Sequence, residues 1–238
     1  MRAIFLSDAH LQQPGDTNYR LLLDFLSSLY GTVDTLCILG DLFDFRVGLP
    51  GLRFPEHDPL LCSLQKLKAA GTRLIYLEGN HDFHLAADLV PRLGVEVYPG
   101  PVSVTLQGQR LLLCHGDLVN RADWRYRLLH RLLRHPMSYQ IAHLLPQRAI
   151  EQLRHKLQQS SKGRYQHDRN RWDYRTIIRA YAQSTQLQGY DAVLLGHFHL
   201  PFIEYLDGFT LVSLGDWISQ FSYAELSDGR LKLFTYQP

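Results

Sequence analysis

The sequence predicts an α/β fold with two packed β-sheets, on two observations. Short apolar runs at residues 3–7, 35–39 and 73–77 alternate with amphipathic stretches, which is the pattern of parallel strands joined by right-handed helical crossovers. Near the end of the chain, further apolar runs flank Asp-Gly turns at 207–208 and 228–229, which indicates antiparallel hairpins. The 238 residues suffice for one sizeable domain, or for a domain with a large insertion.

The stretches between the first three strands have helical spacing. Apolar side chains three and four residues apart predict an amphipathic helix over residues 19–30, which ends at Gly31. A loop rich in Gly and Pro over residues 47–59 leads to a second helix, which ends at Gly71 and carries Leu60, Leu64 and Leu67.

The second half of the chain contains more strand patterns. A hairpin is expected from residues 102–106 and 110–114, which meet at Gln107-Gly108, and a buried strand is expected at 192–196. The closing strands are expected to form a second sheet that packs on the first, and they span residues 202–206, 209–214, 223–226 and 231–236.

Charge is unevenly distributed along the chain. Residues 120–180 contain 14 Lys/Arg and 4 Asp/Glu, a net charge of +10, whereas the remainder carries −8. Such a segment indicates an anionic partner, or simply a solvated helix face. Cys37 and Cys114 lie in apolar runs and are interpreted as buried free thiols of a reducing compartment. A strand begins directly after Met1, and no apolar run approaches ~20 residues, so neither a signal peptide nor a membrane span is expected.

Polar side chains follow several of the apolar strands, where open α/β sheets place their ligands. Asp41 follows the strand at 35–39, and its two oxygens can each take one cation. In an extended segment, Asp8 and His10 would point to the same side, and their mixed oxygen and nitrogen donors suit Mn, Fe, Zn or Co rather than Ca. The other strand-end side chains are Asn80, His81, His115, His197 and His199. One such position alone would be unremarkable, but the repetition predicts a metal centre.

The motifs D-x-H, G-D-x-x-D, G-N-H-D, H-G-D and G-H-x-H occur in this order between Asp8 and His199, and together they resemble the signature of the calcineurin-like metallophosphoesterases. The resemblance implies a two-sheet sandwich, flanked by helices, with a dinuclear site in which Asp41 bridges the ions. By the family pattern, one ion would be held by Asp8, His10, Asp41 and His199, and the other by Asp41, Asn80, His115 and His197. Asp41, Asn80 and His81 would be catalytic, with His81 acting on the leaving group or phosphate and Asp44 orienting a ligand or His81.

Within this superfamily the chain is most similar to the UDP-2,3-diacylglucosamine diphosphatases of lipid A synthesis. The segments that carry this similarity are His115-Gly116-Asp117-Leu118, Asp123 with Tyr126, Arg134-His135-Pro136, Leu144-Leu145-Pro146, Ser160-Ser161-Lys162, Pro201 and Leu214-Gly215-Asp216-Trp217. The similarity implies a metallophosphoesterase core at residues 1–119 and 189–238 and a helical lid insertion at 120–188. It further implies cleavage of UDP-2,3-diacylglucosamine to UMP and 2,3-diacylglucosamine 1-phosphate by attack of water activated by two ions, most often manganese. The implied substrate contacts are Asn80, His81, Asp123, Tyr126, Ser161, Lys162 and His197.

The lid would be lined by apolar side chains with arginines around them, and these leucines would contact lipid or simply pack the helices together: Leu128, Leu129, Leu132, Leu133, Ile141, Leu144 and Leu145. An apolar wall with a basic rim suits a lipid with an anionic head and an anionic membrane surface. The expected location is the cytoplasm, at the cytoplasmic face of the inner membrane, and no nucleic-acid motif accompanies the arginines.

The chain departs from the closest family pattern at three positions, which leaves the exact substrate open. His81 stands where G-N-R-D has Arg, and Phe198 and Leu200 replace Thr and Arg beside His199. One alternative is a metallophosphoesterase acting on another nucleotide, phosphoprotein or phospholipid-type substrate. A second alternative is a binding scaffold without catalytic activity. The presence of every expected metal ligand argues against it.

Overall fold

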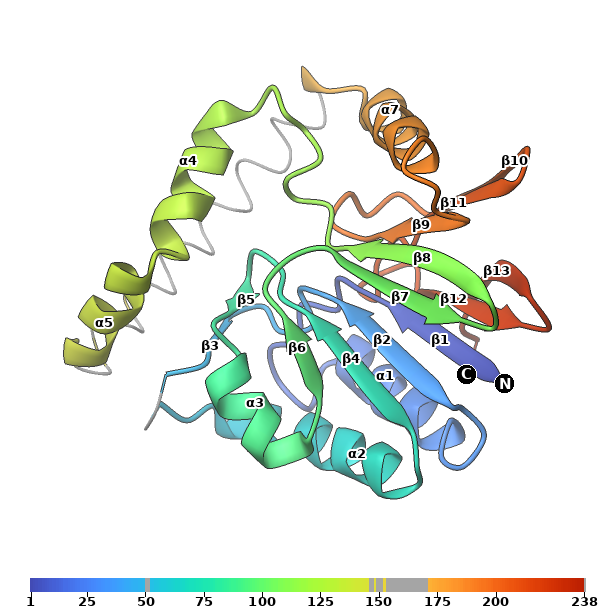
Figure 1. The fold of residues 1–238 in the computed structure, drawn as a ribbon. Coiled ribbons are helices and arrows are strands. Elements are labelled where there is room, and N and C mark those ends of the chain that lie inside the picture. The colour runs from blue at the N-terminus through green and yellow to red at the C-terminus, as the bar shows by residue number, and fades with distance from the viewer. Residues whose placement is uncertain (50–51, 146–147, 149–151, 153–170, 238) are drawn as a thin grey trace.

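A computed structural model describes the chain except for residues 50–51, 146–147, 149–151, 153–170 and 238. Two β-sheets pack face to face, and helices cover their outer faces (Figure 1). The predicted α/β sandwich of two sheets flanked by helices is confirmed.

The first sheet has the strand order β13-β12-β1-β2-β4-β6. Its centre is parallel, as predicted from the β-α-β-α-β succession, because β1 (Arg2–Leu6), β2 (Thr35–Leu39) and β4 (Arg73–Leu77) are joined by helical crossovers. β6 (Glu96–Tyr98) extends the parallel part beside β4. Parallel strands place their carboxyl ends along one edge, so the segments that follow β1, β2 and β4 are neighbours.

The second sheet has the order β10-β11-β9-β8-β7. The expected hairpin forms β7 (Val102–Leu106) and β8 (Gln109–Cys114), and the strand expected at 192–196 is β9 (Ala192–Leu195). β10 (Phe202–Leu206) and β11 (Phe209–Ser213) complete the sheet, in which β9 is parallel to both β8 and β11. The segments after β8 and β9 therefore leave the sheet on the same side.

The expected grouping of the last four strands is wrong. β12 (Ser222–Ser227) and β13 (Arg230–Thr235) belong to the first sheet, where β12 pairs antiparallel with β1. Local alternation indicates that a segment is a strand, but it carries no information about its partner. β12 joins the first sheet because its two faces are both covered there. Leu226 packs in the core between the two sheets, and Tyr223 packs on the side of the helices.

The core between the sheets follows the two-residue period of the strands. Ala3 and Phe5 of β1 face the second sheet, whereas Ile4 and Leu6 face the helices. Cys37 and Cys114 are buried free thiols, as expected, and burial raises their pKa.

The helices cover opposite faces of the sandwich. α1 (Thr17–Ser28), α2 (Asp58–Ala69) and α3 (Ala86–Leu93) lie against the first sheet, and α7 (Tyr174–Gln186) lies against the second through Ile178 and Ala182 (Figure 1). The two predicted helices, α1 and α2, are confirmed. α3 and β6 were not predicted, and neither were the 3₁₀ turn Pro55–His57 or the ribbon of β3 (Arg46–Val47) with β5 (Asp82–Phe83).

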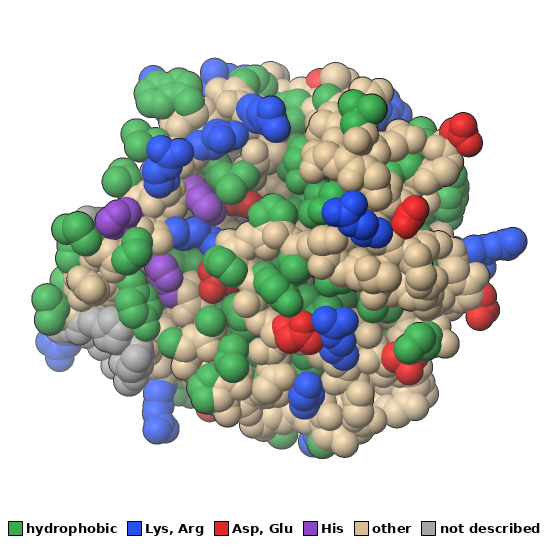
Figure 2. Space-filling view, viewed as in Figure 1, with side chains coloured by type: hydrophobic (Ala, Val, Ile, Leu, Met, Phe, Trp, Pro, Cys, Tyr) green, Lys and Arg blue, Asp and Glu red, His purple; other side chains and the backbone are tan. Residues whose placement is uncertain are grey.

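α4 (Trp124–Leu133) and α5 (Pro136–Leu144) together form the arm, which stands at the side of the sandwich (Figure 1). Hydrophobic side chains and Lys or Arg side chains lie beside one another on the surface that the arm forms (Figure 2). Among the helices that the structure describes, none is long and apolar enough to cross a bilayer.

Candidate metal centre

The predicted strand-end residues meet at one edge of the sandwich. Asp8 and His10 follow β1, Asp41 follows β2, and Asn80 and His81 follow β4. From the second sheet come His115, after β8, and His197 and His199, after β9. Within the described residues, three groups have ligand atoms within 4.8 Å of one another: Asp8 with His10 and His199, Asp41 with His115 and His197, and His10 with Asp44 and His81.

The loops that carry these side chains do not continue their strands as extended segments. The expectation for Asp8 and His10 assumed an extended chain, but their φ angles are 54° and 45°. Asp41 (φ 52°), His197 (69°) and His199 (49°) are also left-handed. Such backbone costs roughly 1–3 kcal/mol per non-glycine residue and is typical of functional sites. The turns curl each loop toward its neighbour, and His10 N donates to Asp41 O over 3.0 Å.

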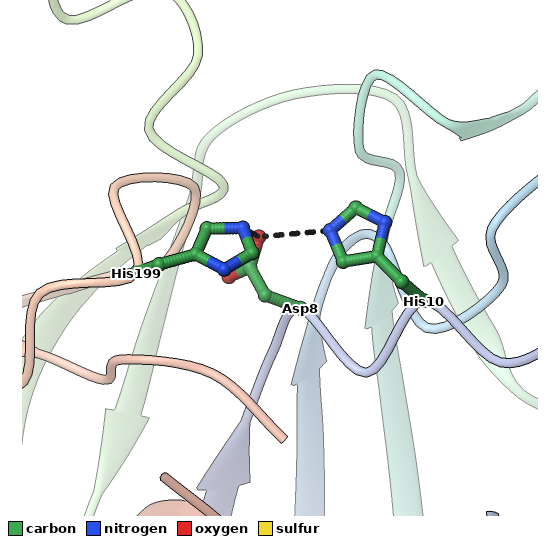
Figure 3. Close-up of side chains that lie close together, drawn as sticks. All are labelled: Asp8, His10 and His199. Carbon is green, nitrogen blue, oxygen red and sulfur yellow. Dashed lines mark ion pairs between the residues drawn. The ribbon is translucent and has the colours of Figure 1, made fainter. Parts of the chain in front are cut away.

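The first group lies between the ends of β1 and β9. His199 Nε2 is 3.5 Å from Asp8 Oδ1, and His10 Nε2 is 3.9 Å from the same oxygen. The two imidazole rings are stacked with their centroids 5.3 Å apart, and the Asp8 carboxylate lies close to both (Figure 3). Two nitrogens and a carboxylate oxygen are donors suited to a transition-metal ion.

The second group surrounds His115. His115 Nε2 is 3.4 Å from Asp41 Oδ2 and 3.1 Å from Asn80 Oδ1. Asp41 Oδ2 also lies 3.7 Å from His10 Nε2, so this one oxygen faces both groups. The other oxygen, Asp41 Oδ1, accepts a 2.8 Å hydrogen bond from His81 N.

The third group is at the outer side of His10. His10 Nδ1 is 3.9 Å from Asp44 Oδ1, and His81 Nδ1 is 2.8 Å from the carbonyl oxygen of Asp44. The His10 and His81 rings meet edge to face, 4.7 Å apart. Asp44 thus contacts both histidines, as the family pattern implied for a residue that orients them.

Glycines let these loops approach closely. A Cβ on Gly79 would overlap with Asp41 Oδ1, a Cβ on Gly196 would overlap with Asp8 Oδ2, and a Cβ on Gly40 would lie 2.6 Å from His115 Nδ1. Atoms at such distances must move apart, so the absence of these side chains is what brings the candidate ligands together.

The site balances buried carboxylates against imidazoles. Burial raises the pKa of Asp8, and it lowers the pKa of His10 and, to about 3, that of His197. Burial also disfavours the charged forms of Asp41 and His115, but the attraction between the two charges outweighs this effect. The pKa of Asp41 is therefore well below its usual value, and the pKa of His115 is well above its usual value. Neutral His10 and His197 are in the metal-binding form, and a cation beside Asp41 could take over the charge that the proton on His115 supplies.

Two buried atoms of the first group also indicate that a metal ion would fit between these residues. Asp8 Oδ1 and His10 Nε2 are buried and have no hydrogen-bond partner among the described residues. A buried polar atom without a partner costs about 1–3 kcal/mol, and binding a shared cation would satisfy both. The residues that come together therefore fit divalent metal ions.

Asp82, the last residue of G-N-H-D, supports the site from beneath and was not predicted to. Its carboxylate accepts hydrogen bonds from the backbone N–H groups of Asp41, Leu42 and Gly79 and from the Tyr76 hydroxyl. Burial and the nearby Asp41 raise the pKa of Asp82 to about 7. The motif position could have indicated this role, since the family pattern includes the Asp.

The arm faces the site with polar side chains. Tyr126 donates a 2.6 Å hydrogen bond from its hydroxyl to Asp117 Oδ2, and His130 Nε2 lies 3.5 Å from the same oxygen. One helical turn after His130, Arg134 donates hydrogen bonds to Glu78 Oε2 (3.0 Å) and to the carbonyl oxygens of Pro99 and Gly79. Tyr126, His130 and Arg134 are four residues apart and form one stripe, the polar stripe of α4.

The opposite side of the arm is apolar and exposed. Leu128, Leu132 and Ile141 are 50%, 57% and 55% exposed, and Trp124, Met137, Leu144 and Leu145 are exposed as well. Leu129 and Leu133 are half-buried. The sequence predicted neither the polar stripe nor which face of α4 would turn outward.

The predicted substrate contacts have different surroundings. Asp123 is the N-cap of α4, where Oδ1 accepts from Tyr126 N over 3.0 Å. The Tyr126 ring lies 6.3 Å from the His197 ring, so Tyr126 is beside the second group. Ser161 and Lys162 lie outside the described residues.

The sequence profile of the calcineurin-like phosphoesterases matches residues 1–201. A Stenotrophomonas maltophilia (strain K279a) protein named UDP-2,3-diacylglucosamine hydrolase is 30% identical, and the alignment covers 99% of this chain and 98% of that protein. A Neisseria meningitidis serogroup B protein of the same name is 29% identical, with 95% and 94% covered. Among solved structures, a novel archaeal phosphodiesterase is 13% identical, with a TM-score of 0.51 over 99% of this chain and 100% of that chain. This last likeness concerns the fold alone.

Proposed function

The chain belongs to the calcineurin-like phosphoesterase family, and we propose that it hydrolyses UDP-2,3-diacylglucosamine to UMP and 2,3-diacylglucosamine 1-phosphate. Membership makes it a metal-dependent hydrolase. One observation carries the substrate: relatives named for this hydrolysis match nearly the whole of both chains, so the alignment includes the arm as well as the sandwich. We divide the chain accordingly, into a core of residues 1–119 and 189–238 and an insertion of 120–188 whose α7 returns to the second sheet.

The strand-end residues would hold two ions, most often Mn²⁺. Asp8, His10 and His199 would bind one, Asn80, His115 and His197 the other, and Asp41 Oδ2 would be shared, as its distances of 3.7 and 3.4 Å to His10 and His115 suggest. Two such ions, when bound, would lower the pKa of a water molecule and offset the negative charge on the phosphoryl oxygens. The protein's own part is to orient the diphosphate and to exchange protons with it.

His81 would act on the phosphate or the leaving oxygen. Its Nδ1 faces the carbonyl oxygen of Asp44 at 2.8 Å, and a carbonyl only accepts, so Nδ1 carries the hydrogen. Nε2 is then the nitrogen that can exchange a proton with substrate. Asn80 would contact the phosphate beside it.

Residues of the insertion would contact the sugar and phosphate end of the substrate. Tyr126 and Asp123 lie at the start of α4, on the side of His197, and we assign them to the sugar. Ser161 and Lys162 would close over the diphosphate.

The arm would bind the anionic surface of the cytoplasmic membrane. Its exposed leucines lie beside arginines, and lipids that carry acyl chains and phosphate match both kinds of side chain. We infer that the protein acts at the cytoplasmic face of the inner membrane, where it would meet its acylated substrate.

The test is UMP release from UDP-2,3-diacylglucosamine with Mn²⁺, with a UDP-sugar that lacks acyl chains run alongside. We expect rapid release from the acylated substrate alone, and its loss in Asp41→Ala because neither group keeps the shared oxygen. Release from neither compound, together with hydrolysis of a simple phosphodiester, would show that the assigned substrate is wrong.

Membrane binding is tested with Leu128→Gln/Leu132→Gln/Ile141→Gln and vesicles that contain anionic phospholipid. The variant should stay folded, because the three side chains are exposed, and should sediment with vesicles much less than the wild-type protein does. Leu187→Gln is the matched control, since Leu187 is 89% exposed but lies at the end of α7. Equal sedimentation of the triple variant and the control would show that the apolar side chains of the arm do not bind the membrane.

A further inference from the structure

Asp216 lies in the turn after β11, outside the residues that the family profile matches. The residue is 4% exposed. Its Oδ1 accepts hydrogen bonds from the backbone N–H groups of Ile218 (2.9 Å), Ser219 (2.8 Å) and Gln220 (3.2 Å). Its Oδ2 points the other way, 3.4 Å from His199 Nδ1. One carboxylate therefore joins the turn to a candidate metal ligand.

The same turn holds the first group from behind. Trp217 N donates to the carbonyl oxygen of Asp8 (3.1 Å), and Gln220 Nε2 donates to the carbonyl oxygen of His199 (3.0 Å). The Trp217 side chain is fully buried and packs against Phe25 of α1. The turn is thus anchored in the core, and Asp216 is held independently of His199.

We propose that Asp216 is a positioning residue that keeps His199 in the tautomer with hydrogen on Nδ1, so that its Nε2 lone pair faces Asp8 and can bind a divalent cation. A neutral imidazole has one N–H and one lone pair, and a carboxylate only accepts, so the nitrogen beside Asp216 carries the hydrogen. The inference rests on the proposed role of His199 as a metal ligand.

The two oxygens of the Asp216 carboxylate have separate partners. Oδ1 accepts from the backbone N–H groups of Ile218, Ser219 and Gln220, and Oδ2 lies 3.4 Å from His199 Nδ1. Because Oδ1 alone satisfies the backbone N–H groups, Oδ2 is available to His199. Carboxylates in this relation to a ligand histidine fix the ring and strengthen the ligand.

The variant Asp216→Asn should change the tautomer of His199 while it leaves the structure of the turn intact. The amide oxygen can keep the bonds to Ile218 N, Ser219 N and Gln220 N, which directs the NH₂ group at His199 Nδ1. An NH₂ group needs an acceptor, so the hydrogen of His199 moves to Nε2, which can then no longer bind an ion. In calorimetric titration of the metal-free protein with Mn²⁺, one ion should bind about 10–100-fold more weakly and the other unchanged.

Two further variants make the result specific. Ser219→Ala leaves the carboxylate and the backbone donors in place and should bind both ions as the wild-type protein does. His199→Ala should lose the same ion as Asp216→Asn, and the double variant should lose no more than His199→Ala, because the two residues act as one unit. Wild-type affinity for both ions in His199→Ala would refute the ligand assignment, whereas wild-type affinity in Asp216→Asn alone would overturn only the role of Asp216.

A measurement on the wild-type chain decides the matter should Asp216→Asn fail to fold. Nitrogen NMR of ¹⁵N-histidine protein loaded with Zn²⁺, with His199→Ala to assign the signal, distinguishes the two ring nitrogens. The proposal expects hydrogen on Nδ1 and zinc on Nε2 of His199. Hydrogen on Nε2, or zinc on Nδ1, would overturn it.

Discussion

At the scale of single residues, the carboxylates of the site have two roles. The carboxylate oxygens of Asp8 and Asp41 point at the candidate ligand histidines. Asp82 instead accepts hydrogen bonds from backbone N–H groups of the loops after β2 and β4, and it thereby holds these two loops in place. The loops can approach this closely only because Gly79 has no side chain, since a Cβ at this position would overlap with Asp41. The position of Asp41 therefore depends on a residue that has no side chain with which to bind an ion.

We predict that Gly79→Ala weakens Mn²⁺ binding and turnover. The added methyl group overlaps with both Asp41 Oδ1 and Asp41 N, so the carboxylate must move, and a displacement of about 1 Å can cost on the order of 10²-fold in rate. Calorimetric titration and turnover with the same substrate measure the effect. Gly15→Ala is the control, because nothing lies within 4 Å of its Cβ position. Equal loss in both variants would mean that the effect is general rather than local to Asp41.

Sequence motifs identified the residues that gather at the site, because those residues directly follow apolar strands. They could not identify the partners that hold them. The Leu214-Gly215-Asp216-Trp217 segment stood out in the sequence, but the contact between Asp216 and His199 exists only once β9 and β11 lie side by side.

At the scale of elements, α4 is turned opposite to an ordinary surface helix. Its polar stripe faces the sandwich, and Leu128 and Leu132 face away. The sequence shows the leucine spacing but not the direction in which the leucines point. That direction depends on the partners of the polar stripe, which are the half-buried Asp117 and the buried Glu78. Short elements were missed for a different reason. β3 and β5 have two residues each, too few for any period, and α3 contains Pro91.

We predict that Arg134→Ala lowers the free energy of unfolding by about 3 kcal/mol, because it leaves the nearly buried Glu78 without its cation. Urea unfolding followed by circular dichroism measures the loss. Arg92→Ala is the comparison: Arg92 pairs with Asp58 at 3.2 Å, but both side chains are well exposed, so its loss should stay below about 1 kcal/mol. Similar losses in the two variants would show that Arg134 does not anchor the arm.

At the scale of the whole molecule, the candidate metal centre joins the two sheets. The first group takes Asp8 from the loop after β1 and His199 from the loop after β9, so an ion bound there would connect both layers. An unfolded chain cannot bring these residues together, which makes metal binding part of the stability of the sandwich.

We therefore predict that Mn²⁺ raises the melting temperature. At a concentration 100 times the Kd, binding adds about 2.7 kcal/mol, and for a chain of this size that corresponds to an increase of roughly 5–10 °C. Thermal unfolding of chelator-treated protein with and without Mn²⁺ measures it, and Asp41→Ala should show a much smaller increase. An unchanged increase in Asp41→Ala would mean that the ion binds elsewhere.

Most strands, the parallel pairing of β1, β2 and β4, and the β7–β8 hairpin could be predicted from the sequence, but the sheet to which each of the last four strands belongs could not. Each of the last four strands shows a clear strand pattern, yet two join one sheet and two join the other. Pairing is decided by contacts between distant segments, such as Ala3 with Leu226, and no local pattern reports them.

The pairing of β12 with β1 also has a consequence for the order of events during protein synthesis. β1 leaves the ribosome long before β12, its neighbour on one side, because the two strands are far apart in the sequence. Until residues 222–227 emerge, β1 keeps an open edge of the kind that invites pairing with other chains. The nascent chain therefore has to protect the free edge of β1 until β12 has been synthesised.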